Sequence, residues 1–193
     1  MTRGADALIG EARALAARQP LVLLALDGRC AAGKTTLANG WGERFGWQVV
    51  HMDDFFLRPE QRTPERYATP GGNVDHERFL AEVLLPLRAG RAARYRPFDC
   101  AALRLSEEEK TVAPAGVVVV EGAYACHPSL WEQYDLRAFA TVGREEQLRR
   151  VAARNGAERL AAFRERWIPL EEAYFAAFDV EARCAYRIGA ETA

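Results

Sequence analysis

The feature of this sequence that most constrains its fold is the stretch GRCAAGKTT at residues 28–36. It follows an apolar run, Leu21–Leu26, and precedes residues typical of a helix. The pattern G-x-x-x-x-G-K-[ST] between a strand and a helix is typical of a phosphate-binding loop, because its glycines let successive backbone N–H groups turn inward toward an anion. The sequence therefore predicts that a nucleotide phosphate binds here.

Individual positions of the loop have expected roles. Lys34 is expected to reach the β- and γ-phosphates of ATP, and the Thr35 hydroxyl to take a position at Mg²⁺. The alternative interpretation is a glycine-rich turn that opens an ordinary helix. Of 26 basic residues only Lys34 and Lys110 are lysines, so the loop keeps a compact point charge in an arginine-rich chain. We predict that ATP contacts the whole loop: Gly28, Arg29, Cys30, Ala31, Ala32, Gly33, Lys34, Thr35 and Thr36. Cys30 is interpreted as a small residue that fills space in the loop, and the less favoured interpretation is a reactive thiol.

Length, composition and net charge limit the classes of protein to which this chain can belong. At 193 residues, with 49% hydrophobic and 27% charged residues, the chain is expected to form a single soluble domain. Its net charge of −1 predicts no nucleic-acid partner, and its apolar runs are too short for a membrane span. Four scattered cysteines without a C-x-x-C pair indicate a reduced, cytoplasmic setting. The three histidines have no metal-ligand spacing, and the segment before Pro20 is an amphipathic helix, not a signal peptide.

Strand and helix patterns alternate along the chain, which indicates βαβ units and the α/β class with a mainly parallel sheet. We expect a three-layer P-loop NTPase sandwich. Two loop-rich regions, 58–74 and 91–114, interrupt the alternation, and the second is predicted to be a hairpin excursion. The expected strands are 21–26, 48–51, 117–120, 138–142 and 186–188, and the expected helices are 34–45, 77–89, 145–154 and 167–178.

Acidic residues follow two of these strands. In parallel sheets ligands bind beyond the carboxyl ends of the strands, where the second strand places Asp53 and Asp54 and the third places Glu121. Asp53 is predicted to be the general base for an acceptor hydroxyl, with a possible contact to Mg²⁺ through water; the alternative is a solvated turn acid or a helix N-cap. Glu121 is predicted to be the acid on the metal side, the alternative being a turn carboxylate before Gly122.

Arginines crowd residues 144–166, and Asn155-Gly156 interrupts the helical pattern. A solvated charged helix would explain such a run. With a phosphate loop upstream, we favour an arginine-rich lid over about 154–166, with Arg154 and Arg159 closing on the transferring phosphoryl group and excluding water.

These pieces together resemble the uridine kinase family and its relatives, the nicotinamide riboside kinases and phosphoribulokinases. The matching stretches are GRCAAGKTT, HMDDFF at 51–56, GGNVDHERF at 71–79, YRPFDC at 95–100, VVVVEG at 117–122 and RRVAARNGAER at 149–159. The resemblance implies that Asp53 is the base, that Asp75 binds ribose hydroxyls, that Tyr95 and Phe98 contact a nucleoside, and that Thr35, Glu121 and Asp53 lie at the metal. It also implies that Arg154 and Arg159 approach the phosphates.

The chain departs from that family's pattern where the base would be read. Phe98 stands where tyrosine is usual, residues 102–104 lack the usual histidine, and Asn155 replaces the lid aspartate. The expected activity is ATP- and Mg²⁺-dependent phosphorylation of a small acceptor, most simply a nucleoside. A sugar or another small alcohol remains an alternative acceptor, and a P-loop ATPase or switch acting on a protein partner remains the alternative class. The sequence does not fix the oligomeric state.

Overall fold

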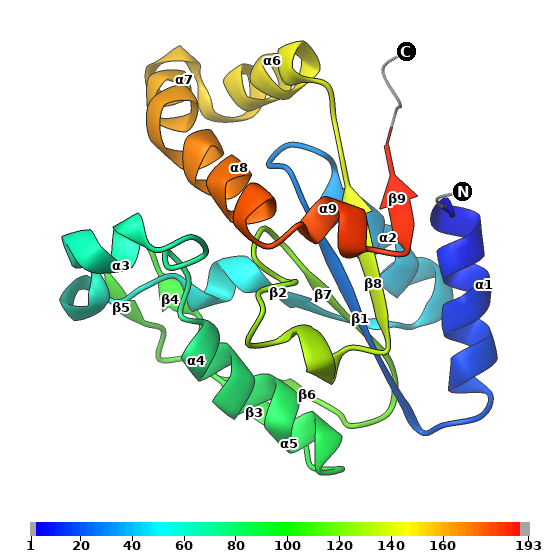
Figure 1. Ribbon diagram of the computed structural model, residues 1–193. Helices are drawn as coiled ribbons and strands as arrows, with labels where there is room; N and C mark the ends of the chain where they lie inside the picture. Colours follow the sequence, from blue (N-terminus) through cyan, green and yellow to red (C-terminus); the bar gives the residue numbers. More distant parts are fainter. Residues whose placement is uncertain (1–2, 190–193) are drawn as a thin grey trace.

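A five-stranded parallel sheet is the middle layer of the computed structural model, which describes residues 3–189 (Figure 1). Its strand order is β2-β7-β1-β8-β9, so β1 is central and pairs with β7 and β8. This confirms the α/β fold with a parallel sheet. The strands are β1 (Leu21–Gly28), β2 (Gln48–His51), β7 (Gly116–Glu121), β8 (Leu136–Ala140) and β9 (Tyr186–Ile188).

The apolar run of β1 supplies both faces of the core, because successive strand side chains point to opposite faces. Leu23 packs into one hydrophobic cluster, with residues of α4–α5 and α8, and Leu24 packs into the other, with residues of α1 and α2. Helices therefore cover both faces, as the three-layer arrangement requires. The covering helices are α1 (Ala5–Ala16) and α2 (Lys34–Phe45) on one side, and α4 (His76–Phe79), η3 (Leu80–Leu84), α5 (Leu85–Arg88), α8 (Ile168–Ala177) and α9 (Val180–Arg183) on the other.

The fourth strand of the sheet lies earlier than predicted. Residues 138–142 were expected, whereas β8 runs from Leu136 to Ala140. The reason lies at its end, where the Ala140 carbonyl accepts the N–H of Arg29 at 3.0 Å. The strand ends there because its last carbonyl holds the phosphate loop.

The two loop-rich regions contain more order than their composition indicates. Residues 58–74 include a short helix that begins with Pro64, and its cap Thr63 accepts the N–H of Arg66 at 3.1 Å. Residues 91–114 form antiparallel pairs, which confirms the hairpin excursion. The elements of these two regions are η2 (Pro59–Gln61), α3 (Pro64–Ala68), β3 (Ala93–Tyr95), β4 (Phe98–Asp99), β5 (Arg104–Leu105) and β6 (Lys110–Val112). Two further turns lie outside them, η1 (Met52–Phe55) after β2 and η4 (Trp131–Gln133) before β8.

The predicted lid is helical and arches over the end of β1 where the phosphate loop begins (Figure 1). Helix α6 (Arg144–Asn155) stops at Gly156, whose φ of 81° is a conformation that favours glycine. Helix α7 (Ala157–Ala162) then continues through a π-helical turn, η5 (Phe163–Trp167), into α8. The lid thus connects directly to a helix of the core.

Candidate active site

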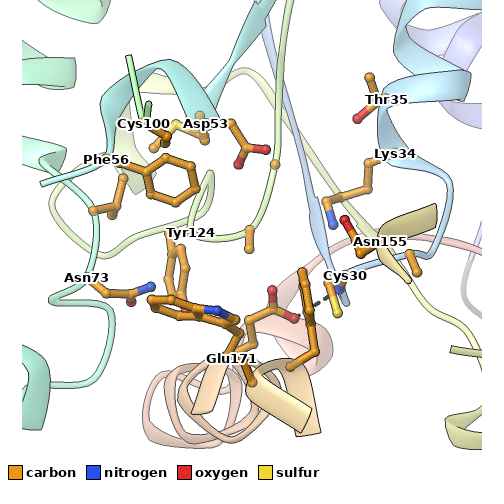
Figure 2. Close-up of a pocket in the computed structure, with 18 of the residues that line it drawn as sticks. Cys30, Lys34, Thr35, Asp53, Phe56, Asn73, Cys100, Tyr124, Asn155 and Glu171 are labelled. Carbon is orange, nitrogen blue, oxygen red and sulfur yellow. Dashed lines mark hydrogen bonds between the residues drawn. The ribbon is translucent and has the colours of Figure 1, made fainter. Parts of the chain in front are cut away.

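A cleft of about 810 Å³ opens at the carboxyl end of the sheet. Its walls come from the phosphate loop, the segments after β2 and β7, the region before α4, and the lid. Figure 2 shows Lys34 and Thr35 at one end of the cleft, Asp53 on one wall, and Glu171 on the opposite wall. The topology therefore brings together residues as far apart in sequence as Cys30 and Glu171.

The loop has the shape of an anion cradle. Gly28 has a φ of 136°, and a Cβ there would lie 1.9 Å from the Ala140 carbonyl oxygen, so no other residue fits. Lys34 is 8% exposed, and its Nζ donates to the carbonyls of Gly28 at 2.7 Å and Arg29 at 2.9 Å. The first N–H groups of α2 have no acceptor within the helix and point toward the same space. The residues present fit the phosphates of a nucleotide.

A buried carboxylate, Asp27, holds the loop from below. Its oxygens accept hydrogen bonds from the backbone N–H groups of Gly28, Tyr124 and Cys126 at 2.6, 3.1 and 2.8 Å, and from the hydroxyl of Tyr174 at 2.8 Å. Burial raises the pKa of Asp27, and the hydrogen bonds from Cys126, Gly28 and Tyr174, together with the charge of Lys34, oppose that shift. Asp27 thus joins β1 to the segment after β7 and to α8.

The side chain of Arg29 points away from the cleft and ties the loop to the helices that follow the lid. It contacts Glu172 of α8 at 2.8 Å and Glu181 of α9 at 3.0 Å, and it donates to the Thr141 hydroxyl at 2.9 Å. Among the loop residues predicted to bind ATP, the cleft is lined by Cys30, Ala31, Gly33, Lys34 and Thr35, but not by Gly28, Arg29, Ala32 or Thr36. For all nine residues, contact with ATP stays a prediction.

The metal-side residues predicted from the sequence meet at one point. The Thr35 hydroxyl donates to Glu121 Oε1 at 3.1 Å, and Glu121 is buried at the end of β7. His51 Nδ1 lies 2.6 Å from the same oxygen, and this hydrogen bond raises the pKa of His51. A hydroxyl and one carboxylate fit Mg²⁺, which typically takes few protein ligands together with phosphate oxygens and water. Among residues 3–189 no group of three or more His, Cys, Asp and Glu could hold a metal ion.

Replacing Thr35 with alanine should raise the Mg²⁺ concentration needed for half-maximal activity by about tenfold, because one oxygen ligand is lost. The measurement is ADP release as a function of Mg²⁺ concentration at saturating ATP. Thr111→Ala is the matched control, since Thr111 is an exposed threonine of β6 that does not line the cleft. An equal effect of both changes would contradict the assignment of Thr35 to the metal.

Asp53 lies in η1 and faces the cleft. The surrounding walls of the cleft raise the pKa of Asp53 by desolvation, and Glu121 raises it further, while Lys34, His51 and Arg154 oppose the shift. A raised pKa makes the carboxylate a stronger base, as proton abstraction from a hydroxyl requires. The neighbouring Asp54 has a different role: its Oδ2 accepts from the Tyr95 hydroxyl at 3.0 Å and from Lys110 Nζ at 2.8 Å, which anchors the hairpin.

The lid brings three arginines to the cleft. Arg154 and Arg159, predicted from the sequence, both line it. Arg150 also lines it and donates to the Ala31 carbonyl of the loop at 3.1 Å. The sequence signal for Arg150 was its i, i+4 spacing from Arg154 on one helix face. The phosphate end of the cleft is thus positively charged.

The predicted nucleoside contacts do not line the cleft. Asp75 is 2% exposed and caps α4, accepting the N–H of Arg78 at 3.1 Å. Tyr95 packs against Phe55, with ring centroids 4.9 Å apart, and Phe98 lies beneath the Arg62 guanidinium at 5.3 Å. The contact of these three residues with an acceptor stays a prediction.

Glu171 of α8 is a cleft residue that the sequence analysis missed. Its Oε2 accepts the N–H of Cys30 at 2.9 Å, and burial raises its pKa to about 7. Burial and the Glu171 carboxylate raise the pKa of the Cys30 thiol to about 12, so Cys30 stays protonated and fits the loop-filler interpretation. A glutamate in a helical pattern carries no signal for such a position, since most are exposed.

The raised pKa of Glu171 predicts a pH-dependent cost to stability. The folded state binds a proton that the unfolded state releases between the ordinary glutamate pKa of 4.5 and about 7, so the wild type loses stability as pH rises through this window. The charged groups facing Glu171 are Lys34 and Asp27, beside the Cys30 thiol. The difference in free energy of unfolding between Glu171→Gln and the wild type should therefore shift in favour of the variant by on the order of 2 kcal/mol from pH 5 to pH 8. Urea unfolding at both pH values checks this, and a constant difference would contradict it.

Comparisons with solved structures agree with this architecture. A candidate fructose transport system kinase from a Silicibacter species matches with a TM-score of 0.74 at 21% identity, covering 95% of this chain and 98% of that one. The chain has the P-loop NTPase fold. A candidate uridine kinase from Bacillus stearothermophilus matches at 0.70 and 18% identity (95% and 97% covered), and D-glycerate 3-kinase from Cryptococcus neoformans at 0.63 and 18% (95% and 93%). No family model and no curated protein matches the sequence.

These likenesses establish the fold. The matched proteins are described as kinases of different acceptors, so the choice of acceptor is not fixed by the fold. No helix among residues 3–189 is long and apolar enough to cross a membrane.

Proposed function

We propose that this chain is a kinase that transfers the γ-phosphoryl group of Mg-ATP to a hydroxyl of a small acceptor. The observation that carries the proposal is the position of Asp53, whose carboxylate faces the same cleft as Lys34 and Thr35 (Figure 2). The kinase descriptions of the matched structures support the same class.

The chemistry assigned to each residue follows from its position. Asp53 accepts the proton of the acceptor hydroxyl as that oxygen bonds to the γ-phosphorus and the bond to the β–γ bridging oxygen breaks, releasing ADP. Lys34, Arg154 and Arg159 offset the negative charge that spreads over the transferring group. Mg²⁺, held by Thr35 and Glu121, would supply charge neutralisation between the β- and γ-phosphates. Positioning in a closed cleft provides the rest of the rate enhancement.

The resemblance of the short motifs favours a nucleoside as the acceptor, and a neutral sugar or alcohol is the second candidate. The test is ADP release in Mg-ATP with uridine, cytidine, nicotinamide riboside, pantothenate, D-ribulose 5-phosphate, D-fructose and D-glycerate. Strong stimulation by one compound supports the kinase and identifies its acceptor class. ATP binding without stimulation by any of them would count against the kinase and favour an ATPase that acts on a protein partner.

A further inference from the structure

Three polar side chains line the acceptor side of the cleft, and each is more than nine-tenths buried. Asn73, Tyr124 and Glu171 are 8%, 5% and 7% exposed, and they come from the loop before α4, the segment after β7, and α8. Figure 2 shows Tyr124 between the Asn73 amide and the Glu171 carboxylate, and both neighbours affect the pKa of its phenol. Buried polar groups of this kind normally have hydrogen-bond partners.

Among these three residues, Tyr124 is the one whose hydrogen bonding is incomplete. Its buried hydroxyl has no partner within hydrogen-bond geometry among the described residues, although the Asn73 amide lies close enough to lower its pKa. Its φ of 73° is unusual for a residue with a side chain. The strained backbone persists because Asp27 accepts the Tyr124 N–H at 3.1 Å. A buried, unpartnered hydroxyl held by a strained backbone in a cleft points to a ligand that completes it.

The three groups match hydroxyls better than charged ligands. An amide and a phenol each donate and accept, as an alcohol does. Glu171 has a pKa raised by burial to about 7, so near neutral pH it either accepts from a hydroxyl or donates to one. Asp53 and Glu171 face this side of the cleft, and two carboxyl groups disfavour an anionic acceptor. Arg62 also lines the cleft, and its Nε donates to the Leu57 carbonyl at 3.0 Å.

We propose that Asn73, Tyr124 and Glu171 form the subsite that binds acceptor hydroxyls adjacent to the one phosphorylated, so that the acceptor is a neutral polyhydroxy compound. This inference rests on the proposed kinase function. It assigns acceptor specificity to three residues that line the cleft, in place of Asp75, which does not line the cleft and whose Oδ1 caps α4. Specificity would come from the penalty of leaving these buried groups unpaired when an acceptor lacks the matching hydroxyls.

The test measures binding and turnover separately. The probes are D-ribose, D-fructose and uridine, with 2-deoxy-D-ribose and 2′-deoxyuridine as analogues that lack one hydroxyl. Calorimetry with Mg-AMP-PNP bound gives the affinity for each probe, and ADP release gives KM and kcat. The variants are Tyr124→Phe and Glu171→Gln. Tyr134→Phe is the matched control, because Tyr134 is also buried with an unpartnered hydroxyl but does not line the cleft.

We expect at least one polyhydroxy probe to bind the wild type. Each cleft variant should weaken that binding about tenfold, and Tyr124→Phe should also leave the affinity for AMP-PNP unchanged and reduce the preference for a probe over its deoxy analogue. Tyr134→Phe should change neither. Removing a hydroxyl without a partner should not unfold the protein, which thermal unfolding of both tyrosine variants checks.

The subsite and the kinase function fail in different ways. If no probe binds the wild type, or if the cleft variants bind as the wild type does, the subsite is overturned even where ADP release is stimulated. If a probe binds and the variants weaken it without any ADP release, the subsite is supported and the kinase function is the part that fails.

Discussion

Asp53→Asn should lower phosphoryl transfer by roughly 10²–10⁴-fold while ATP still binds with wild-type affinity. The amide keeps the shape of the side chain but cannot accept the proton of the acceptor hydroxyl. ATP binding depends on the loop and on Lys34, whose contacts with the Gly28 and Arg29 carbonyls do not involve Asp53. The loss should appear in kcat, because the proton moves as the phosphoryl group is transferred.

The measurement is kcat with the acceptor that stimulates ADP release, together with calorimetry of Mg-AMP-PNP binding. Asp54→Asn is the matched control: it changes the neighbouring carboxylate, which contacts Tyr95 and Lys110 and does not line the cleft. Near-normal turnover of Asp53→Asn would remove Asp53 as the base. A similar loss in Asp54→Asn would mean that the position of the hairpin, not proton transfer, limits the rate.

The pattern of strands and helices was predictable because the apolar periods of this chain are strong. The strand at Gln48–His51 and the helix at Lys34–Phe45 lie where the sequence places them. The short helix α3 was not predicted, since one cap and one proline within a Pro- and Gly-rich region also fit a loop. The end of β8 was misplaced because a contact with the phosphate loop, distant in sequence, determines where that strand stops.

The site residues that could be predicted are those that lie at strand ends or belong to a motif with a defined spacing. Lys34, Asp53 and Glu121 follow strands, and the parallel sheet brings the ends of those strands together. Tyr124 also lies just beyond the end of β7, so the same rule could have indicated it. Glu171 had no such signal, because its place depends on how α8 packs against the loop. For Asp75 the structure shows a role that the motif did not indicate, since its Oδ1 caps α4.

Asp27 is the residue whose loss should cost this fold the most stability. Asp27→Ala leaves three backbone N–H groups and the Tyr174 hydroxyl without their acceptor in a fully buried region. Each unsatisfied buried donor costs about 1 kcal/mol or more, so the change should lower the free energy of unfolding by on the order of 4 kcal/mol. For a chain of this length the Tm should fall by roughly 10 °C.

Urea and thermal unfolding test this expectation, and Tyr174→Phe is the control. That variant removes one of the four donors and leaves the carboxylate in place, so it should cost only about 1 kcal/mol. The Asp27→Ala protein that remains folded should also bind AMP-PNP more weakly, because Asp27 accepts the Gly28 N–H where β1 becomes the phosphate loop. A loss in Asp27→Ala no larger than that in Tyr174→Phe would mean that the three backbone donors find other partners, and that Asp27 does not hold the loop.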